Sequence, residues 1–377
     1  QYSWETNHWA LLGDHFSAAL RPRLQLQITN DQGRKENGFF VQELYGSAYF
    51  LNTQIDFGRR QIIWGQSRLG GMILSNNARP VDGITIFNPS PWKIRYLGNL
   101  RYTFFLATLG PEQNFRNPLF SGIKLSLMPV DWFEAGIARA LIFGGEGSPS
   151  SSFGDHLSDY FGARPGNINS VNLSNSINGF ELRGRIPPLR NLELYAEFYF
   201  DDFTLGHPLR SLVQDSGISA GIYLPRADTK GSVSLRLEGK KTSSVLYKHP
   251  DWNWALNHFV LGDPLGADAE SAGIRLIKRL NPKTKVTGQF TFERIDSDTY
   301  QGGVPEGRRK TVDGTAEKRF RGSLGLSHQF TKRLHAAVDF GYEHVSDFNF
   351  AEGNNRENFL FNLALELNID DLTGWKR

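Results

Sequence analysis

Residues 179–205, GFELRGRIPPLRNLELYAEFYFDDFTL, contain two stretches of strict alternation joined by a short turn. In the first, Phe180, Leu182 and Ile186 alternate with charged residues, and from Leu192 to Asp201 apolar and polar residues alternate again. Since successive side chains of a strand point to opposite faces, each stretch predicts a strand with one apolar and one polar face. A length of about ten residues suits a tilted strand that crosses a bilayer. A packed core does not tolerate unpaired charges, so the polar face is expected to meet water or a polar lumen.

The same alternation recurs along the chain, in residues 20–28, 123–127, 233–238, 285–293, 319–330, 334–343 and 359–368. Short turns are expected near 51–53, 88–91, 129–131, 187–191, 225–231, 280–284 and 331–333. Long polar loops are expected near 30–38, 65–83, 111–117, 144–176, 201–216, 239–271, 296–318 and 345–357. Short turns at one end and long loops at the other are typical of outer-membrane barrels. The predicted fold is therefore all-β, a transmembrane antiparallel β-barrel of about 16–18 strands with short periplasmic turns and long extracellular loops.

The barrel is expected to occupy residues 16–369. An N-terminal periplasmic segment, 1–15, would precede it and a C-terminal tail, 370–377, would follow it. No apolar run approaches the roughly 18 residues of a membrane-spanning helix. The chain starts at Gln1 without a signal-like segment, so it is expected to be a mature or trimmed form. A soluble propeller is disfavoured, because no repeat of about 40 residues is present.

The composition excludes several classes of function. The chain has no cysteine, which rules out disulfides, zinc knuckles and thiol nucleophiles. Its net charge of +3 is too small to indicate nucleic acid as a partner. Residues 217–221 match GxSxG, but the alternation continues through Leu224, so a plain strand is expected rather than a nucleophile elbow. With no HExxH pair and no P-loop, the chain is predicted not to be an enzyme and to need no cofactor or metal.

Residues 58–80, GRRQIIWGQSRLGGMILSNNARP, resemble the Wzi-type capsule-assembly family of outer-membrane proteins. Further matches in residues 142–145, 218–225, 235–238, 247–249 and 261–268 extend the resemblance over roughly residues 40–280. The resemblance implies an outer-membrane barrel of about 18 strands that holds surface polysaccharide as a lectin. It also implies an N-terminal helical bundle that closes the periplasmic side. Residues 1–12 are too short for that bundle, so this chain is expected to lack it or to have been trimmed.

Two loops carry the candidate polysaccharide-binding residues, which are Trp64, Asn76, Asn77, Arg79, Tyr247, His249, Trp252 and Trp254. Aromatic faces could stack on sugar rings, and the planar fork of Arg79 suits the carboxylates of acidic polysaccharides. In the alternative interpretation, the first loop is a structural plug and the aromatic residues pack on each other or lie in the membrane girdle.

The polar faces of the strands predict a ladder of lumen charges made of Arg183, Arg185, Arg236, Arg319, Arg321, Glu193 and Glu197. Cross-strand ion pairs that fill the barrel are one interpretation. A charged constriction that selects anionic solutes is the other.

The preferred hypothesis is a non-enzymatic, lectin-like barrel in the bacterial outer membrane that attaches capsular or exopolysaccharide to the surface of a Gram-negative cell. Its expected partners are surface polysaccharide, outer-membrane lipid and other envelope export proteins, without nucleic acid. Two alternatives stay open, a porin-like channel for anionic solutes and a barrel sleeve around a partner envelope protein.

Overall fold

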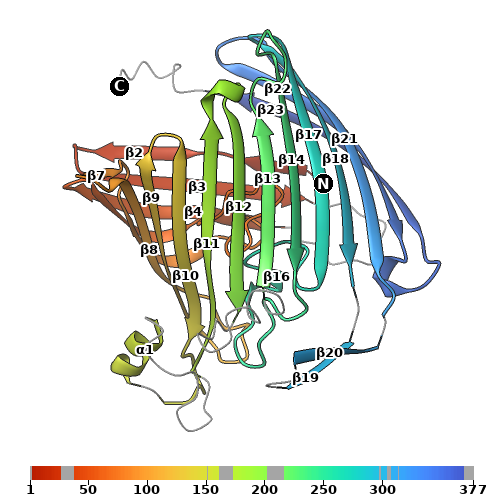
Figure 1. Cartoon of the computed structure of the whole chain (residues 1–377). Coiled ribbons are helices and arrows are strands. Elements are labelled where there is room, and N and C mark those ends of the chain that lie inside the picture. The colour runs from red at the N-terminus through yellow and green to blue at the C-terminus, as the bar shows by residue number, and fades with distance from the viewer. Residues whose placement is uncertain are drawn as a thin grey trace.

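The computed structural model describes residues 2–26, 38–150, 152–160, 173–201, 216–296, 299–303, 307–312 and 314–368. A 19-stranded antiparallel sheet curves around a central volume (Figure 1). Its first half contains β1 (Tyr2–Glu5), β2 (His8–Leu12), β3 (Phe16–Leu26), β4 (Gly38–Phe50), β5 (Thr53–Arg60), β6 (Val81–Phe87), β7 (Trp92–Ile94), β8 (Gly98–Thr108), β9 (Leu119–Val130) and β10 (Phe133–Phe143). The second half contains β11 (Ser174–Ile186), β12 (Leu192–Asp201), β13 (Ser216–Leu224), β14 (Val233–Thr242), β17 (Ala269–Asn281), β18 (Thr284–Ile295), β21 (Glu317–Gln329), β22 (Leu334–Ser346) and β23 (Arg356–Leu367).

The remaining elements are short and lie in the connections. They are helix α1 (Phe153–Tyr160), the 3₁₀ turns η1 (Pro187–Leu189) and η2 (Phe348–Phe350), and the strand pairs β15 (Ala255–Leu256) with β16 (Phe259–Val260) and β19 (Thr299–Gly303) with β20 (Gly307–Val312). No helix within the described ranges is both long enough and apolar enough to cross a membrane.

Each main strand pairs with its neighbours in the sequence, as the hairpin pattern predicts. β1 and β2 pair with successive parts of β3, and β6 and β7 pair with successive parts of β8, so the 19 strands occupy 17 positions around the sheet. Among the described residues, β23 is paired with β22 alone, and β1 and β2 with β3 alone. The all-β antiparallel prediction is confirmed, and the number of positions agrees with the predicted strand count.

Short and long connections alternate along the chain. The short ones are 51–52, 95–97, 131–132, 187–191, 225–232, 282–283 and 330–333, and the long ones include 61–80, 109–118, 144–173, 243–268, 296–316 and 347–355. For β9 to β14, the short turns lie at the top of Figure 1 and the long loops at the bottom. We call these ends of the barrel the turn end and the loop end.

The N-terminal segment differs from the sequence prediction. Residues 1–15 are expected to lie outside the barrel, but residues 2–5 and 8–12 form strands β1 and β2 within the sheet. Pairing with β3 satisfies main-chain groups that lipid would leave without partners. The predicted C-terminal tail, 370–377, lies outside the described residues.

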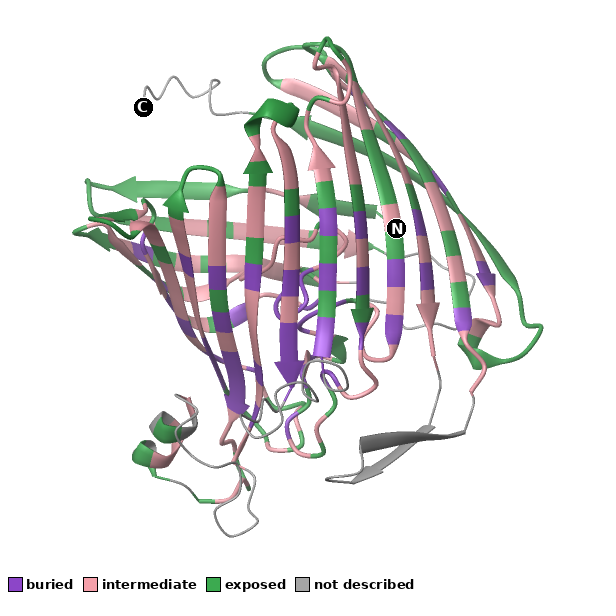
Figure 2. Ribbon diagram, viewed as in Figure 1, coloured by how far each residue is buried: buried purple, intermediate pink, exposed green. Residues whose placement is uncertain are grey.

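The burial pattern of the wall is the reverse of that in a soluble protein. On β11 and β12 the apolar side chains of Leu182 and Leu194 are 39% and 43% exposed, whereas Glu181 and Glu197 are 2% and 0% exposed. In Figure 2 the buried positions of β9 to β14 gather mainly toward the loop end. An apolar outer face and a polar inner face are what a barrel in lipid requires.

Candidate functional site

Two long loops fold back into the barrel and fill the loop-end half of the lumen. Residues 61–80 connect β5 to β6, and residues 243–268 connect β14 to β17. Met72 and Ile73 from the first loop and Leu246 from the second are fully buried, and they belong to one hydrophobic cluster with inward-facing residues of the wall. We call these two loops together the plug.

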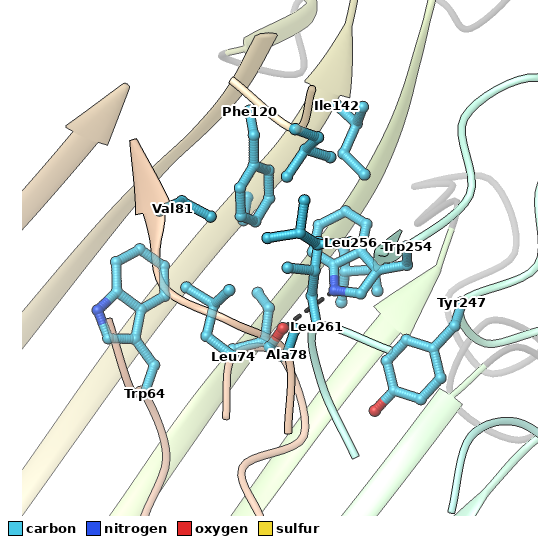
Figure 3. Close-up of a cluster of buried hydrophobic side chains, with 14 of the residues drawn as sticks. Trp64, Leu74, Ala78, Val81, Phe120, Ile142, Tyr247, Trp254, Leu256 and Leu261 are labelled. Atoms are coloured by element: carbon cyan, nitrogen blue, oxygen red, sulfur yellow. Dashed lines mark hydrogen bonds between the residues drawn. The ribbon is translucent and has the colours of Figure 1, made fainter. Parts of the chain in front are cut away.

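Hydrogen bonds join the two loops of the plug directly. The main-chain N–H of Ser75 donates to the carbonyl oxygen of Leu261 at 2.8 Å, and the Asn77 side chain donates to the carbonyl oxygen of Val260 at 2.9 Å. The indole N–H of Trp254 donates to the carbonyl oxygen of Ile73 at 3.0 Å, the bond drawn in Figure 3. Such buried bonds fix how one loop lies against the other.

Two glycines allow the chains of the plug to approach this closely. A Cβ on Gly71 would lie 2.4 Å from the carbonyl oxygens of both Trp64 and Leu74. A Cβ on Gly262 would lie 2.4 Å from the carbonyl oxygen of Met72. Only glycine fits where two backbones come so near each other.

Aromatic rings make up one side of the plug and continue into the wall. Trp64 packs edge-on against Phe105 of β8 with ring centroids 5.3 Å apart, and Phe105 packs on Phe120 of β9 at 4.9 Å. Phe120 in turn meets Trp254 at 5.4 Å, so the rings link both loops through the wall. Figure 3 shows Trp64, Phe120 and Trp254 around Leu74 and Leu261.

Buried charges of the wall hold the main chain of the first loop. Glu197 accepts hydrogen bonds from the main-chain N–H groups of Gln66 and Ser67. Glu238 accepts from the N–H of Arg68 at 2.7 Å, and Lys240 donates to the carbonyl oxygen of Leu69 at 3.0 Å. Four consecutive residues of the loop are thus tied to β12 and β14.

A buried ion pair ties the second loop to β14, the strand that carries Lys240. The Lys240 ammonium lies 2.5 Å from the Asp263 carboxylate, and both side chains are almost fully buried. Burial raises the pKa of the Asp263 carboxyl, and the neighbouring Lys240 ammonium acts in the opposite direction. Since Lys240 also binds Leu69, this one side chain contacts both loops.

Four of the predicted sugar-stacking residues lie inside the plug. Trp64, Tyr247, Trp252 and Trp254 are between 1% and 5% exposed. The Trp252 indole donates to the carbonyl oxygen of Gly144 at 2.9 Å, and the Tyr247 hydroxyl donates to that of Met72. Neighbouring side chains cover these rings, so in this structure no sugar can stack on them. The placement agrees with the alternative interpretation, in which the loop aromatics pack on each other.

The other candidates occupy different environments. Asn76 is exposed, next to Asn77, whose side chain binds Val260. The Arg79 guanidinium lies 4.1 Å from the ring centroid of Phe40 on β4. Nδ1 of His249 accepts hydrogen bonds from the N–H groups of Asp251 and Trp252 at 3.0 and 3.1 Å, which orders the start of the aromatic segment.

The predicted lumen charges form ion pairs in most places. Arg183 pairs with Glu134, its direct cross-strand neighbour, at 2.5 Å, and Arg321 pairs with Glu293 at 2.9 Å. Arg319 contacts Glu317, and Arg236 lies 3.6 Å from Glu238. Arg185 donates to the carbonyl oxygen of Asp131, and Glu193 lines a small cavity with Arg185 at the turn end. This arrangement agrees with the filled-barrel interpretation.

A polar cavity of about 200 Å³ lies on the turn-end side of the plug. Its lining includes Gln66 from the plug, Arg101 from β8 and Arg183 from β11. The lumen is therefore less completely filled on this side of the plug than within it.

Residues missed by the sequence analysis cover the outer side of the plug. The loop 109–118 reaches across, where Asn114 donates to the carbonyl oxygen of Pro250 at 2.6 Å and Gln113 donates to that of Ala255. The outer loop surface, as we call it, consists of the exposed side chains of Glu112, Lys248, Asn253 and His258. The signal available in the sequence was the polar residues interspersed among the tryptophans of 247–258.

Known proteins share this architecture. The structure of Wzi from Escherichia coli, described as an outer membrane protein involved in group 1 capsule assembly and a carbohydrate-binding β-barrel, superposes with a TM-score of 0.75 at 18% identity, covering 97% of this chain and 78% of that one. The outer membrane protein OprD from Pseudomonas aeruginosa superposes with a TM-score of 0.53 at 12% identity, covering 97% and 86%. These likenesses establish an outer-membrane barrel fold.

Sequence comparison gives the family. An uncharacterized 55.8 kDa protein in the cps region of Klebsiella pneumoniae is 25% identical over 204 residues, which are 52% of this chain and only 37% of that relative. The family model described as capsule assembly protein Wzi matches residues 3–360, nearly the whole chain. An outer-membrane barrel whose sequence fits that model over almost its full length belongs to the Wzi family of capsule assembly proteins.

Proposed function

We propose that this protein is a lectin-like outer-membrane barrel that attaches capsular or exopolysaccharide to the cell surface, without chemical change to the polymer. Family membership supports a role in capsule assembly. The related Wzi of Escherichia coli is described as a carbohydrate-binding β-barrel, and this chain has the same fold.

The observation that carries the proposal is the plugged lumen. Two loops, interlocked through Ser75, Asn77 and Trp254 and tied to the wall through Glu197 and Lys240, fill the loop-end half of the barrel. A barrel closed in this way is unsuited to conduct solutes and well suited to hold a rigid outer surface. Rigid sites lose little entropy when they bind a ligand.

The proposed contact region is the outer loop surface together with Asn76. Its polar side chains offer hydrogen bonds to sugar hydroxyls, and Lys248 offers positive charge to acidic sugars. A repeating polymer engages many barrels at once, so weak binding at each site is enough for attachment. Outer-membrane lipid surrounds the wall, and other envelope export proteins would deliver the polymer to this surface.

The test is direct binding of the purified barrel to the polymer of its own host, immobilised on a sensor, with an unrelated neutral dextran as control. With the polymer on the sensor, we expect binding that rises with the concentration of the barrel. In the reverse format, with the barrel on the sensor, we expect binding of the polymer to increase with the density of immobilised barrel. Absence of binding in both formats would refute the proposal.

Conductance in a planar bilayer addresses the channel alternative, since a steadily open pore would contradict the plug. Co-purification of a second chain inside the barrel would instead favour the sleeve.

A further inference from the structure

At the loop end of β22 and β23, a serine, a histidine and a glutamate form a hydrogen-bonded chain. Nε2 of His344 lies 3.2 Å from the hydroxyl oxygen of Ser346, and Nδ1 of His344 lies 2.6 Å from the carboxylate of Glu357. The other carboxylate oxygen of Glu357 accepts the hydrogen bond of the Tyr342 hydroxyl. A carboxylate that binds Nδ1–H leaves Nε2 free to accept the serine proton, which is the geometry of a serine hydrolase triad.

The local strand structure explains this geometry. His344 and Ser346 are two residues apart on β22, so both side chains point to the same face. Glu357 stands directly opposite His344 on β23. Strand β22 ends at Ser346, and Asp347 has a φ of +56°, so the chain turns sharply just after the serine and leaves it at the rim.

The triad faces outward, away from the lumen. Tyr342, two residues before His344, is 40% exposed, and its partner Phe359 is 72% exposed. The same face continues toward the turn end as Phe340 and Phe361, at 52% and 69% exposed. Since β22 ends at Ser346, His344 and Ser346 lie where the apolar outer wall of β22 and β23 ends.

This position determines the class of substrate. The boundary between the apolar wall and the polar loops is the level at which aromatic belts and lipid headgroups meet. The ester bonds that join acyl chains to headgroups lie at this depth. Lys318 of β21 stands directly opposite Ser346 in register and is exposed, so it adds a positive charge beside the serine on the same face.

We propose that Ser346, His344 and Glu357 hydrolyse long-chain acyl esters of lipids in the outer leaflet, an activity beyond polysaccharide attachment. The Ser346 hydroxyl oxygen attacks the ester carbonyl carbon, and its proton passes to Nε2 of His344. The bond from the carbonyl carbon to the alcohol oxygen breaks, and His344 returns the proton to that oxygen. Water then attacks the carbonyl carbon of the acyl-serine and loses a proton to Nε2 of His344. The bond from that carbon to the Ser346 oxygen breaks, and His344 returns the proton to this oxygen, which releases the fatty acid and restores Ser346. Lys318 stabilises the negative charge that develops during both attacks.

The site is separate from the plug. No residue of the triad belongs to residues 61–80 or 243–268, and the triad faces the opposite side of the wall. Loss of hydrolysis should therefore leave polysaccharide binding unchanged, and the two proposals can fail independently.

The test uses the purified full chain in detergent micelles, with folding checked by its mobility on unheated gels. A fluorophosphonate probe should label the wild-type protein, and mass spectrometry should place the label on Ser346. Fatty acid release is measured from vesicles of phosphatidylethanolamine and, separately, from lipopolysaccharide, which distinguishes the two lipid sources. Ser346→Ala should abolish both labelling and release. His344→Ala should reduce release by at least about 100-fold, the usual contribution of a general base.

The matched control is Ser323→Ala on neighbouring β21, a serine paired with Gly341 and outside the triad. It should label and hydrolyse as the wild type does. Folded wild-type protein that neither reacts with the probe nor releases fatty acid from either lipid would overturn the proposal. Activity that survives in Ser346→Ala would overturn it equally, because it would come from elsewhere.

Discussion

The carboxylate of Glu197 on β12 accepts a hydrogen bond of 2.6 Å from the main-chain N–H of Ser67. The two residues are 130 positions apart in the sequence, and the bond ties the first plug loop to the wall. The same carboxylate accepts the N–H of Gln66. A single wall residue thus satisfies two half-buried donors of a segment that has no regular secondary structure.

Replacing Glu197 by Ala should loosen the plug. Two half-buried N–H groups would lose their acceptor, at up to about 1–3 kcal/mol each. We expect transient openings in planar bilayer recordings, where the wild type stays closed. Glu193→Ala is the matched control, since Glu193 lies on the same strand near the turn end and lines a cavity away from the plug. Recordings of Glu197→Ala that match the wild type would show that the bond does not hold the plug closed.

The buried pair of Lys240 and Asp263 should behave asymmetrically on mutation. Lys240→Met leaves the Asp263 charge buried without its partner, and removal of one member of such a pair typically costs about 3–5 kcal/mol. The double variant Lys240→Met with Asp263→Leu removes both charges and should regain most of that loss. Hydrogen exchange over residues 243–268 measures the opening free energy. A double variant as unstable as the single one would contradict a simple ion-pair role.

Trp254→Ala should destabilise the plug through a cavity. Trp254 is 1% exposed, packs on Phe120 and binds the carbonyl oxygen of Ile73, and truncation of a buried tryptophan costs about 3–5 kcal/mol. The midpoint of thermal unfolding in detergent should fall. Trp132→Ala at a turn is the control, because Trp132 is 56% exposed, and its midpoint should stay near that of the wild type. If both variants lowered the unfolding midpoint equally, the destabilisation would not come from the loss of a buried side chain.

The wall could be predicted from the sequence because its signal is local. Alternation alone assigns Glu181 and Glu197 to the lumen and Leu182 and Leu194 to the lipid, and the burial of these residues agrees. The two N-terminal strands were not predicted, because the prediction depended on this local alternation. β1 and β2 have four and five residues, too few for alternation to stand out, and only their pairing with β3 reveals them.

The plug could not be predicted from local patterns. A tryptophan in a long loop is compatible with a sugar platform and with a core, and periodicity does not decide between them. The decision depends on contacts across the sequence, such as that of Trp254 with Ile73, which are 181 residues apart. The proposed triad could not be predicted either. In the sequence, His344 and Ser346 are ordinary strand residues, and only the pairing of β22 with β23 brings Glu357 opposite His344.

Lys248 and Asn253 test where the polymer binds. Both side chains are exposed on the second plug loop, between residues that are buried, so their replacement by Ala leaves the packing of the plug intact. Each lost hydrogen bond costs about 0.5–1.5 kcal/mol, so the double variant should bind the host polymer roughly tenfold more weakly at a single site. Because attachment is multivalent, cells that carry this variant should also shed capsule into the medium. Lys332→Ala is the control, an exposed lysine of the 330–333 turn at the opposite end of the barrel, and it should bind as the wild type does. If Lys332→Ala weakened binding of the polymer and the double variant did not, the polymer would bind from the periplasmic side and the outer loop surface would have another role.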